Sequence, residues 1–208
     1  MQSKIPKQYL LLNRVPVIVR TIRKFINSFP DIEVIVSCSQ SDTVQFEKIR
    51  NRFLKKANIQ IAKGGATRFH SVKSALSKIK SDGVVGVHDS VRPFVSEQLI
   101  QNTFLAAEKF DAVIPCCELI DSIRELKKDK NNSVSRNNYR IVQTPQCFKV
   151  SVIKKAYKQK FDSAFTDDAS VVEKTGVKIE LIEGETTNIK LTTPTDLKLA
   201  AIILSEKN

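Results

Sequence analysis

Hydrophobic and polar residues follow two different periods along the chain, and segments of the two kinds alternate. Short apolar runs typical of strands occur at 31–37, 58–62, 83–88, 111–117 and 179–184. Segments with apolar residues at helical spacing occur at 16–29, 43–56, 70–79, 96–110, 150–159, 166–176 and 193–206. In the first of these, Val17, Ile18, Ile22 and Phe25 share one helical face. This order predicts an α/β fold in which a mostly parallel sheet is flanked by helices.

End signals agree with several of these helices. Ser96 and Thr193 stand at N-cap positions, where a hydroxyl oxygen can accept a hydrogen bond from a free backbone N–H group. Pro16 and Pro194 suit a first helical turn, because proline has no N–H group to leave unsatisfied there. Gly176 marks the expected end of its helix.

The alternation of strands and helices stops at about 118–140. Two stretches with alternating apolar residues flank a polar, Asn-rich turn, and such an excursion has little to pack against in its own domain. A disordered loop and an arm that pairs with another subunit both fit this pattern, and we favour the arm because its flanks are apolar. No change of composition marks a linker. We therefore expect one domain over 1–208, with a β-arm at about 118–140.

The composition is that of an ordinary soluble protein. Hydrophobic residues make up 41% and charged residues 27% of the 208 residues. No apolar run approaches the length of a membrane span or a signal-peptide core, so we expect a cytoplasmic protein with no membrane partner. The four cysteines lie in apolar stretches without a CxxC spacing, which indicates buried free thiols. They are Cys38, Cys116, Cys117 and Cys147.

A net charge of +12 suggests a nucleic-acid partner, but the distribution of the charge argues against one. The basic residues are spread along the chain, and aromatic residues are only 7% with no Trp, so stacking platforms for bases are scarce. We expect a solvated, lysine-rich surface. Such a surface would also attract a small phosphorylated substrate.

Five short stretches carry residues whose chemistry stands out: IPKQYL, GGATRFHSV, HDSVRP, SVSRN and TTNIKLTTP. Each has an ordinary structural interpretation when taken alone, as a turn, a helix start or an exposed charge. Together they supply the cations Lys7, Arg92, Arg136 and Lys190, and the carboxylate Asp89 at the end of a strand, where open α/β sheets bind ligands. Nucleotidyl transfer needs such positive charge around phosphate oxygens. One carboxylate with substrate phosphates can hold Mg²⁺.

The order of the motifs resembles that of one enzyme family. PKQYL, GGxxRxxSV, VHDxxRP, DSI, SRN, TPQ, TDDAS and NIKLTTPTDL are arranged as in the 2-C-methyl-D-erythritol 4-phosphate cytidylyltransferases of the non-mevalonate pathway of isoprene biosynthesis. The resemblance covers essentially the whole chain. It implies a Rossmann-like nucleotidyltransferase fold, a homodimer joined through protruding β-arms, and a Mg²⁺-dependent transferase. The implied reaction joins CTP to the polyol phosphate and releases pyrophosphate.

The resemblance also implies roles for individual residues. The catalytic residues would be Lys7 at the α-phosphate, Arg92 at the sugar phosphate, and Lys190. The nucleotide would be bound by Gly65, Ala66, Arg68, Ser71 and Asp89, and Asp89 would also face the metal. The polyol phosphate would be positioned by Ser122, Arg136 and Lys190, with Arg136 reaching across the dimer. Ser122 stands where the family commonly has Thr, and Ala66 where it often has an acid.

One part of the family's pattern has no counterpart in this sequence. The family begins with a strand and a glycine-rich loop of the form AAGxGxRM that wraps the triphosphate, whereas Met1 aligns with the methionine that ends that loop. Either translation starts upstream of Met1, which we favour because the other site residues are present, or this is a shortened, weakly active or inactive form. We expect the 208-residue chain to bind CTP weakly.

Three other functions remain open from the sequence. A ribitol 5-phosphate cytidylyltransferase shares the PKQ and HDxxRP motifs, and product formation from each polyol phosphate would separate the two. A basic nucleic-acid-binding protein would bind DNA or RNA with a steep dependence on salt, but gives no reason for HDSVRP, TPQ and TDDAS. An inactive homologue with a purely structural role would release no pyrophosphate.

Overall fold

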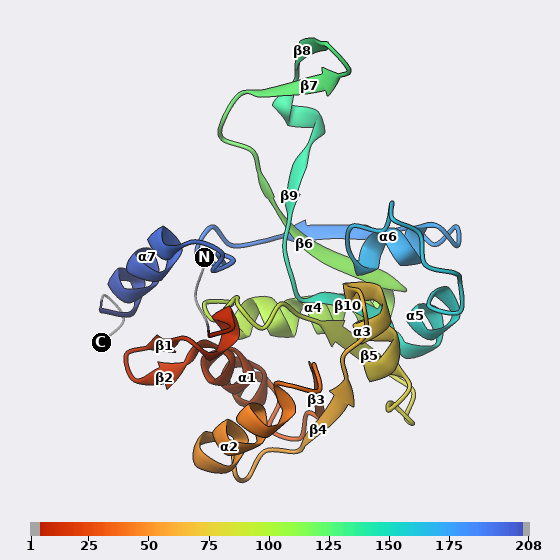
Figure 1. The fold of residues 1–208 in the computed structure, drawn as a ribbon. Coiled ribbons are helices and arrows are strands. Elements are labelled where there is room, and N and C mark those ends of the chain that lie inside the picture. Colours follow the sequence, from red (N-terminus) through yellow and green to blue (C-terminus); the bar gives the residue numbers. More distant parts are fainter. Residues whose placement is uncertain (1–4, 206–208) are drawn as a thin grey trace.

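A computed structural model describes residues 5–205, and Met1 lies outside the described residues (Figure 1). The elements in chain order are η1 (Lys7–Tyr9), β1 (Leu11–Leu12), β2 (Val15–Pro16), α1 (Val17–Ser28), β3 (Val34–Cys38), α2 (Thr43–Phe53), β4 (Ile59–Lys63), α3 (Arg68–Leu76), β5 (Val84–Val87), α4 (Glu97–Lys109), β6 (Ala112–Glu118), β7 (Ile123–Lys127), β8 (Lys130–Val134), η2 (Arg136–Asn138), β9 (Arg140–Val142), β10 (Gln146–Lys149), α5 (Val150–Ala156), α6 (Asp168–Glu173), β11 (Glu180–Glu183) and α7 (Pro194–Ser205).

The predicted helix caps are present. The Ser96 hydroxyl accepts a hydrogen bond from the Leu99 N–H group at 2.9 Å at the start of α4. At the start of α7, Thr193 and Asp196 each accept a hydrogen bond from the other's backbone N–H group. These reciprocal bonds satisfy donors that the first turn of a helix leaves free.

The larger sheet has the strand order β11–β6–β10–β5, and β9 pairs with the end of β6. β11 runs parallel to β6, whereas β10 lies antiparallel between β5 and β6. The predicted α/β class is confirmed, and QCFK contributes a strand that the apolar pattern did not indicate. Gln146 of β10 lies opposite Val87, so the TPQ motif reaches the end of β5.

Helices cover both faces of this sheet, and alternate strand side chains face them. α4 packs on one face, where Val113 and Cys147 are buried with Ala107. On the other face, Ile114 and Phe148 belong to the core formed with α3, α5 and α6. Because successive side chains of β6 and β10 point to opposite faces of the sheet, each strand contributes to the core on both faces.

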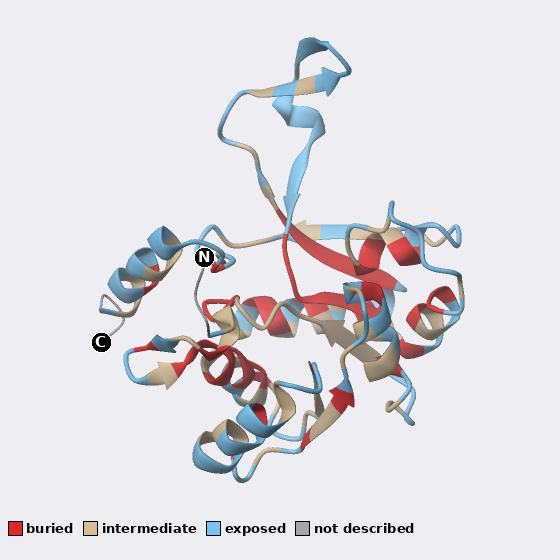
Figure 2. Cartoon of the chain, in the orientation of Figure 1, coloured by how far each residue is buried: buried red, intermediate tan, exposed pale blue. Residues whose placement is uncertain are grey.

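A gap separates this sheet from a second, parallel pair of strands. β3 pairs with β4, and within residues 5–205 no strand pairing joins β3 to β5. All four residues of β5 are only half-buried, whereas the first five residues of β6 are fully buried (Figure 2). Within residues 5–205, no other strand pairs with the edges of β3 and β5 that face the gap.

β7 and β8 form a hairpin at the end of an arm that projects from the body of the molecule (Figure 1). Its turn contains Lys128 at a φ of 51°. The arm is exposed over most of its length (Figure 2), and two of its large apolar side chains, Ile120 and Leu126, are 78% and 77% exposed.

Two further expectations concern cysteines and membrane spans. All four cysteines are free; three are buried and Cys117 is half-buried. Over residues 5–205, none of the helices has the length and apolar character that crossing a bilayer requires.

Candidate nucleotide-binding site

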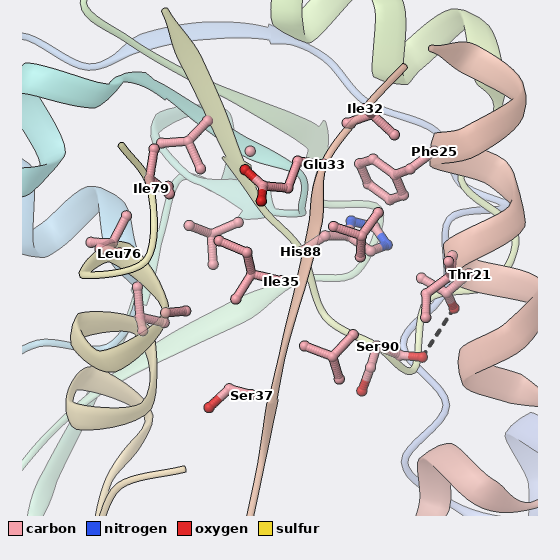
Figure 3. A pocket seen from close by; sticks show the side chains of 18 of the residues that line it. Thr21, Phe25, Ile32, Glu33, Ile35, Ser37, Leu76, Ile79, His88 and Ser90 are labelled. Atoms are coloured by element: carbon pink, nitrogen blue, oxygen red, sulfur yellow. Dashed lines mark hydrogen bonds between the residues drawn. The ribbon is translucent and has the colours of Figure 1, made fainter. Parts of the chain in front are cut away.

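The gap between β3 and β5 contains a cavity of about 670 Å³ that is lined mainly by apolar side chains. Thr21 and Phe25 of α1 line one side of it, and Leu76 and Ile79 of α3 and the segment after it line the other (Figure 3). At one end the lining becomes polar. Three of the residues predicted to bind nucleotide belong to this lining: Arg68, Ser71 and Asp89.

The turn that follows β5 presents Asp89 to the cavity, and hydrogen bonds fix its backbone. The N–H group of Asp89 donates to the Thr144 hydroxyl at 3.1 Å, and the N–H group of Arg92 donates to the Asp89 carbonyl at 3.0 Å. From the side of α1, the Thr21 hydroxyl donates to the Ser90 carbonyl at 3.0 Å (Figure 3). The HDSVRP motif is therefore a rigid turn between the sheet and α1.

The carboxylate of Asp89 joins two of the predicted cations. Arg92 Nε and Lys190 Nζ each lie 3.1 Å from Asp89 Oδ2. Burial alone would raise the pKa of Asp89, but the charge of Lys190, and then that of Arg92, outweighs burial and lowers this pKa below its ordinary value. Asp89 is therefore held as a carboxylate at the edge of the cavity.

Arg92 is largely buried, with 9% of its surface exposed. Its Nη1 donates to the Asn188 carbonyl at 2.6 Å, which joins the HDSVRP turn to the NIK motif. The Leu191 N–H group adds a second link by donating to the Val91 carbonyl. These contacts place Lys190 beside Asp89 and make Arg92 an anchor of the cluster.

His88, which is half-buried and lines the cavity, hydrogen-bonds to the residues around the cluster (Figure 3). Its Nδ1 lies 3.0 Å from the Thr144 hydroxyl and its Nε2 lies 3.2 Å from the Arg92 carbonyl. Because the Arg92 carbonyl can only accept, Nε2 carries the proton of the ring, and in the neutral ring Nδ1 then accepts the proton of the Thr144 hydroxyl. Burial lowers the pKa of His88 to about 4, so the ring is neutral at pH 7.

The GGATRFHSV motif forms the start of α3 on the opposite side of the cavity. The Gly65 N–H group donates to the Ser71 hydroxyl at 3.0 Å, and Thr67 caps the helix. A Cβ atom at Gly65 would lie 2.3 Å from His70 Cβ, so the backbone passes too close to the helix for a larger residue. The glycine and the hydroxyl thus fix the start of α3, from which Ser71 reaches the cavity lining, and Ala66 is exposed beside them.

The remaining predicted residues lie at different distances from this cluster. Lys7 is half-buried in η1, next to Gln8 and Tyr9, which line the cavity. Ser122 and Arg136 are exposed on the arm, and Arg136 Nη1 donates to the Ile120 carbonyl. Within one chain, the structure brings Asp89, Arg92 and Lys190 together, and of these three only Asp89 lines the cavity. The predicted residues Lys7, Gly65, Ala66, Ser122 and Arg136 also lie outside the cavity lining.

Sequence reasoning gave no role to several residues that shape the site. Asp168 is fully buried and binds Arg68 Nη2 at 2.5 Å. Asn188, also fully buried, donates to the Thr144 carbonyl at 2.9 Å. The motifs TPQ, TDDAS and NIK contain these residues, but the motif order alone does not reveal that their side chains join the cavity walls to one another.

A divalent cation would find one protein carboxylate here. Among residues 5–205, no group of three or more His, Cys, Asp or Glu side chains is arranged to hold a metal ion. Asp89 is nevertheless compatible with Mg²⁺, which commonly takes one or two carboxylates together with substrate phosphates and water. Its Oδ2 atom is shared with Arg92 and Lys190.

Comparisons of the whole chain with known proteins give matches that agree with one another. A family model described as 2-C-methyl-D-erythritol 4-phosphate cytidylyltransferase matches residues 1–206. Proteins of that name from Phocaeicola vulgatus and Bacteroides fragilis are each 43% identical to this chain, over 98% of it and 93% of their own length. The crystal structure of 4-diphosphocytidyl-2C-methyl-D-erythritol synthase from Anaerococcus prevotii is 27% identical and superposes with a TM-score of 0.85, over 96% of this chain and 90% of that one.

Proposed function

This chain belongs to the 2-C-methyl-D-erythritol 4-phosphate cytidylyltransferase family, and we propose that its two substrates meet around Asp89, at the end of the cavity that the turn after β5 forms. The enzyme is a nucleotidyltransferase of isoprenoid precursor biosynthesis. It joins CTP and 2-C-methyl-D-erythritol 4-phosphate to give 4-diphosphocytidyl-2-C-methyl-D-erythritol and pyrophosphate. The observation that supports the proposed location best is the cluster of Asp89, Arg92 and Lys190 at the polar end of the cavity.

The reaction forms one bond at the α-phosphorus and breaks another. An oxygen of the polyol phosphate attacks the α-phosphorus of CTP, and the bond to the oxygen that leads to the β-phosphorus breaks, which releases pyrophosphate. Negative charge spreads over the phosphate oxygens in the transition state, so preorganised cations lower its free energy most. We assign this role to Lys7 and Lys190, with Arg92 holding Lys190 and Asp89 in register.

The nucleotide lies against the start of α3 in this proposal. Gly65 and Ala66 offer backbone groups at the helix start, and Ser71 and Arg68 offer side chains. Asp89 contacts the ribose side of the nucleotide. Mg²⁺, when bound, would neutralise charge on the triphosphate, and Asp89 is the residue that would hold it.

We also propose that Ser122 and Arg136 act from the arm of a second subunit of a homodimer in the cytoplasm. The exposed Ile120 and Leu126 give the arm apolar surface that a partner chain would cover. A 1:1 mixture of Arg136→Ala and Lys190→Met subunits tests this. If Arg136 acts across the dimer, mixed dimers contain one intact site and recover activity that neither variant has alone; no recovery would contradict the proposal.

The function itself is tested by incubating the protein with CTP, Mg²⁺ and either methylerythritol phosphate or ribitol 5-phosphate. We expect pyrophosphate release with the first polyol phosphate and little with the second. Asp89→Asn should abolish release, whereas the exposed carboxylate Glu118 offers a matched control as Glu118→Gln. Release that survives Asp89→Asn at the wild-type rate would contradict the proposed site.

A further inference from the structure

Arg68 is held by a buried carboxylate that no part of the proposed reaction uses. Asp168, at the start of α6, has no exposed surface. One of its oxygens, Oδ2, lies 2.5 Å from Arg68 Nη2, and the other, Oδ1, accepts a hydrogen bond from the Tyr157 hydroxyl at 2.6 Å. Each oxygen of the Asp168 carboxylate therefore has a partner: Oδ1 contacts Tyr157 in the core, and Oδ2 contacts Arg68 in the cavity lining.

The rest of the TDDAS motif fixes Asp168 from behind. Asp167 caps α6 by accepting from the Ser170 N–H group at 2.8 Å. Gln146 of β10 donates to Asp167 at 2.7 Å and accepts from the Ala169 N–H group at 2.9 Å. Since β10 pairs with β5, the same framework that fixes the position of Asp89 also fixes that of Asp168.

Arg68 stands between this framework and the cavity. Burial would lower its pKa, but the charge of Asp168, followed by that of Asp89, outweighs burial and raises this pKa above its ordinary value. The Arg68 guanidinium therefore interacts electrostatically with two carboxylates, those of Asp168 and Asp89. About 41% of the side chain remains exposed, and the residue lines the cavity, so a ligand can still reach it.

A purely structural role explains this arrangement poorly. Burying an ionised carboxylate costs free energy that a well-packed apolar pair would not, so a buried ion pair is weak stabilisation by itself. The helices already pack through apolar contacts, because Phe69, next to Arg68, stacks on Tyr157 with ring centroids 4.7 Å apart. What the ion pair adds is a fixed direction for one guanidinium.

We propose that Asp168, oriented by Tyr157, is a positioning residue that fixes the Arg68 guanidinium at the cavity wall for contact with a nucleoside triphosphate. This inference rests on the proposed function, since it takes CTP as the ligand. Without the carboxylate, Arg68 would sample other rotamers, and part of the binding free energy would be spent on ordering it.

The test compares Asp168→Asn and Tyr157→Phe with Ser96→Ala, which removes the cap of α4 and contacts neither Arg68 nor Asp168. Steady-state kinetics give the KM for CTP and kcat of each variant. Mass spectrometry follows the rate at which phenylglyoxal modifies Arg68. Thermal denaturation gives the melting temperature. We expect Asp168→Asn to raise the KM for CTP about tenfold with a small change in kcat, and to speed modification of Arg68. Tyr157→Phe should do the same to a smaller extent, and Ser96→Ala should lower only the melting temperature.

A double substitution separates positioning from other effects. In the background of Arg68→Lys, the change Asp168→Asn should add little to the KM for CTP, because the two residues act as one unit. If Asp168→Asn lowers the melting temperature as Ser96→Ala does, with the KM and the modification rate unchanged, the role is structural and the inference is wrong. If Asp168→Asn does not fold, Tyr157→Phe decides by the same measurements.

The labelling readout does not depend on turnover. If the wild-type protein fails to use CTP, the proposed function fails, while faster modification of Arg68 in Asp168→Asn would still support the positioning of Arg68 by Asp168. An unchanged rate of modification overturns the inference whether or not the enzyme is active.

Discussion

Lys190 Nζ lies 3.1 Å from Asp89 Oδ2, and this contact joins the NIK motif before α7 to the turn that ends β5. Arg92 contacts the same carboxylate oxygen from within its own turn. A lone carboxylate between two cations leaves the cluster with net positive charge. That charge is what an incoming phosphate group requires, and several predictions about single residues depend on it.

Replacing Lys190 should affect both the rate and its dependence on pH. We expect Lys190→Met to lower kcat about a hundredfold, because a cation near the developing charge is lost. Lys190 is also the strongest of the groups that lower the pKa of Asp89, so this pKa should rise in the variant. Activity that requires ionised Asp89 is lost as the pH falls through its pKa, and the acid limb of kcat/KM should therefore move to higher pH.

Lys198→Met is the control for that experiment. Lys198 lies on α7, is exposed, and carries the same charge. Its replacement should leave both kcat and the acid limb in place. If the two lysine variants behave alike, the effect comes from net charge and the Asp89–Lys190 contact has no special part.

Arg92 should matter more for stability than its position beside the cavity suggests. Arg92→Met leaves the Asn188 carbonyl without its donor and leaves Lys190 as the one cation beside Asp89 in a largely buried place, and we expect the free energy of unfolding to fall by about 3 kcal/mol. Urea denaturation measures this. Arg23→Met, at an exposed arginine of α1, should cost less than about 0.5 kcal/mol. Equal losses would show that Arg92 is not an anchor.

His88 should make the protein sensitive to mild acid. Its pKa is about 4 in the folded protein and about 6.5 in an unfolded chain, so the unfolded state binds the proton more readily between these values. Stability is fully present above about pH 6.5 and is lost as the pH falls toward 4, by on the order of 3 kcal/mol at pH 4. Melting temperatures across this range should fall more steeply for the wild type than for His88→Gln. The exposed His70 gives the control His70→Gln, which should keep the wild-type slope.

Gly65 should tolerate no side chain. Gly65→Ala would place a Cβ atom against His70 and push the start of α3 away, so we expect the KM for CTP to rise at least about tenfold and the stability to fall by about 1–3 kcal/mol. Gly83→Ala separates these effects, because Gly83 has a φ of 113° but open space around it. That variant should lose stability and keep its KM for CTP.

The sequence predicted the helices and most strands because their apolar period is strong and their caps are clear. It did not predict β10, because Gln146 and Cys147 of TPQCFK show no alternation that separates a strand from the end of the arm. Burial of Gln146 becomes understandable only in three dimensions, where its amide meets Asp167 and Ala169. Buried polar contacts of this kind follow from packing between distant segments and leave no periodic signal in the sequence.

The sequence indicated the chemistry of the site more clearly than the contacts that each of its residues makes. Motif order pointed to Asp89, Arg92 and Lys190 as one group, and the structure brings them together. Motif order also predicts that Arg92 contacts phosphate, and the structure adds hydrogen bonds from its Nε and Nη1 atoms to Asp89 and Asn188. Which cation binds a ligand and which holds its neighbour depends on distances that residue spacing does not contain.

The gap between β3 and β5 affects which part of the molecule unfolds locally most easily. Because no ladder of backbone hydrogen bonds crosses it in the described part of the chain, β3, β4 and α2 are tied to the rest mainly through helices and side chains. Such a unit can open by itself at a lower free energy than global unfolding requires. Backbone amides of β3 and β4 should therefore exchange with deuterated solvent well before those of β6 and β10, and a nucleotide bound along this seam would slow that exchange.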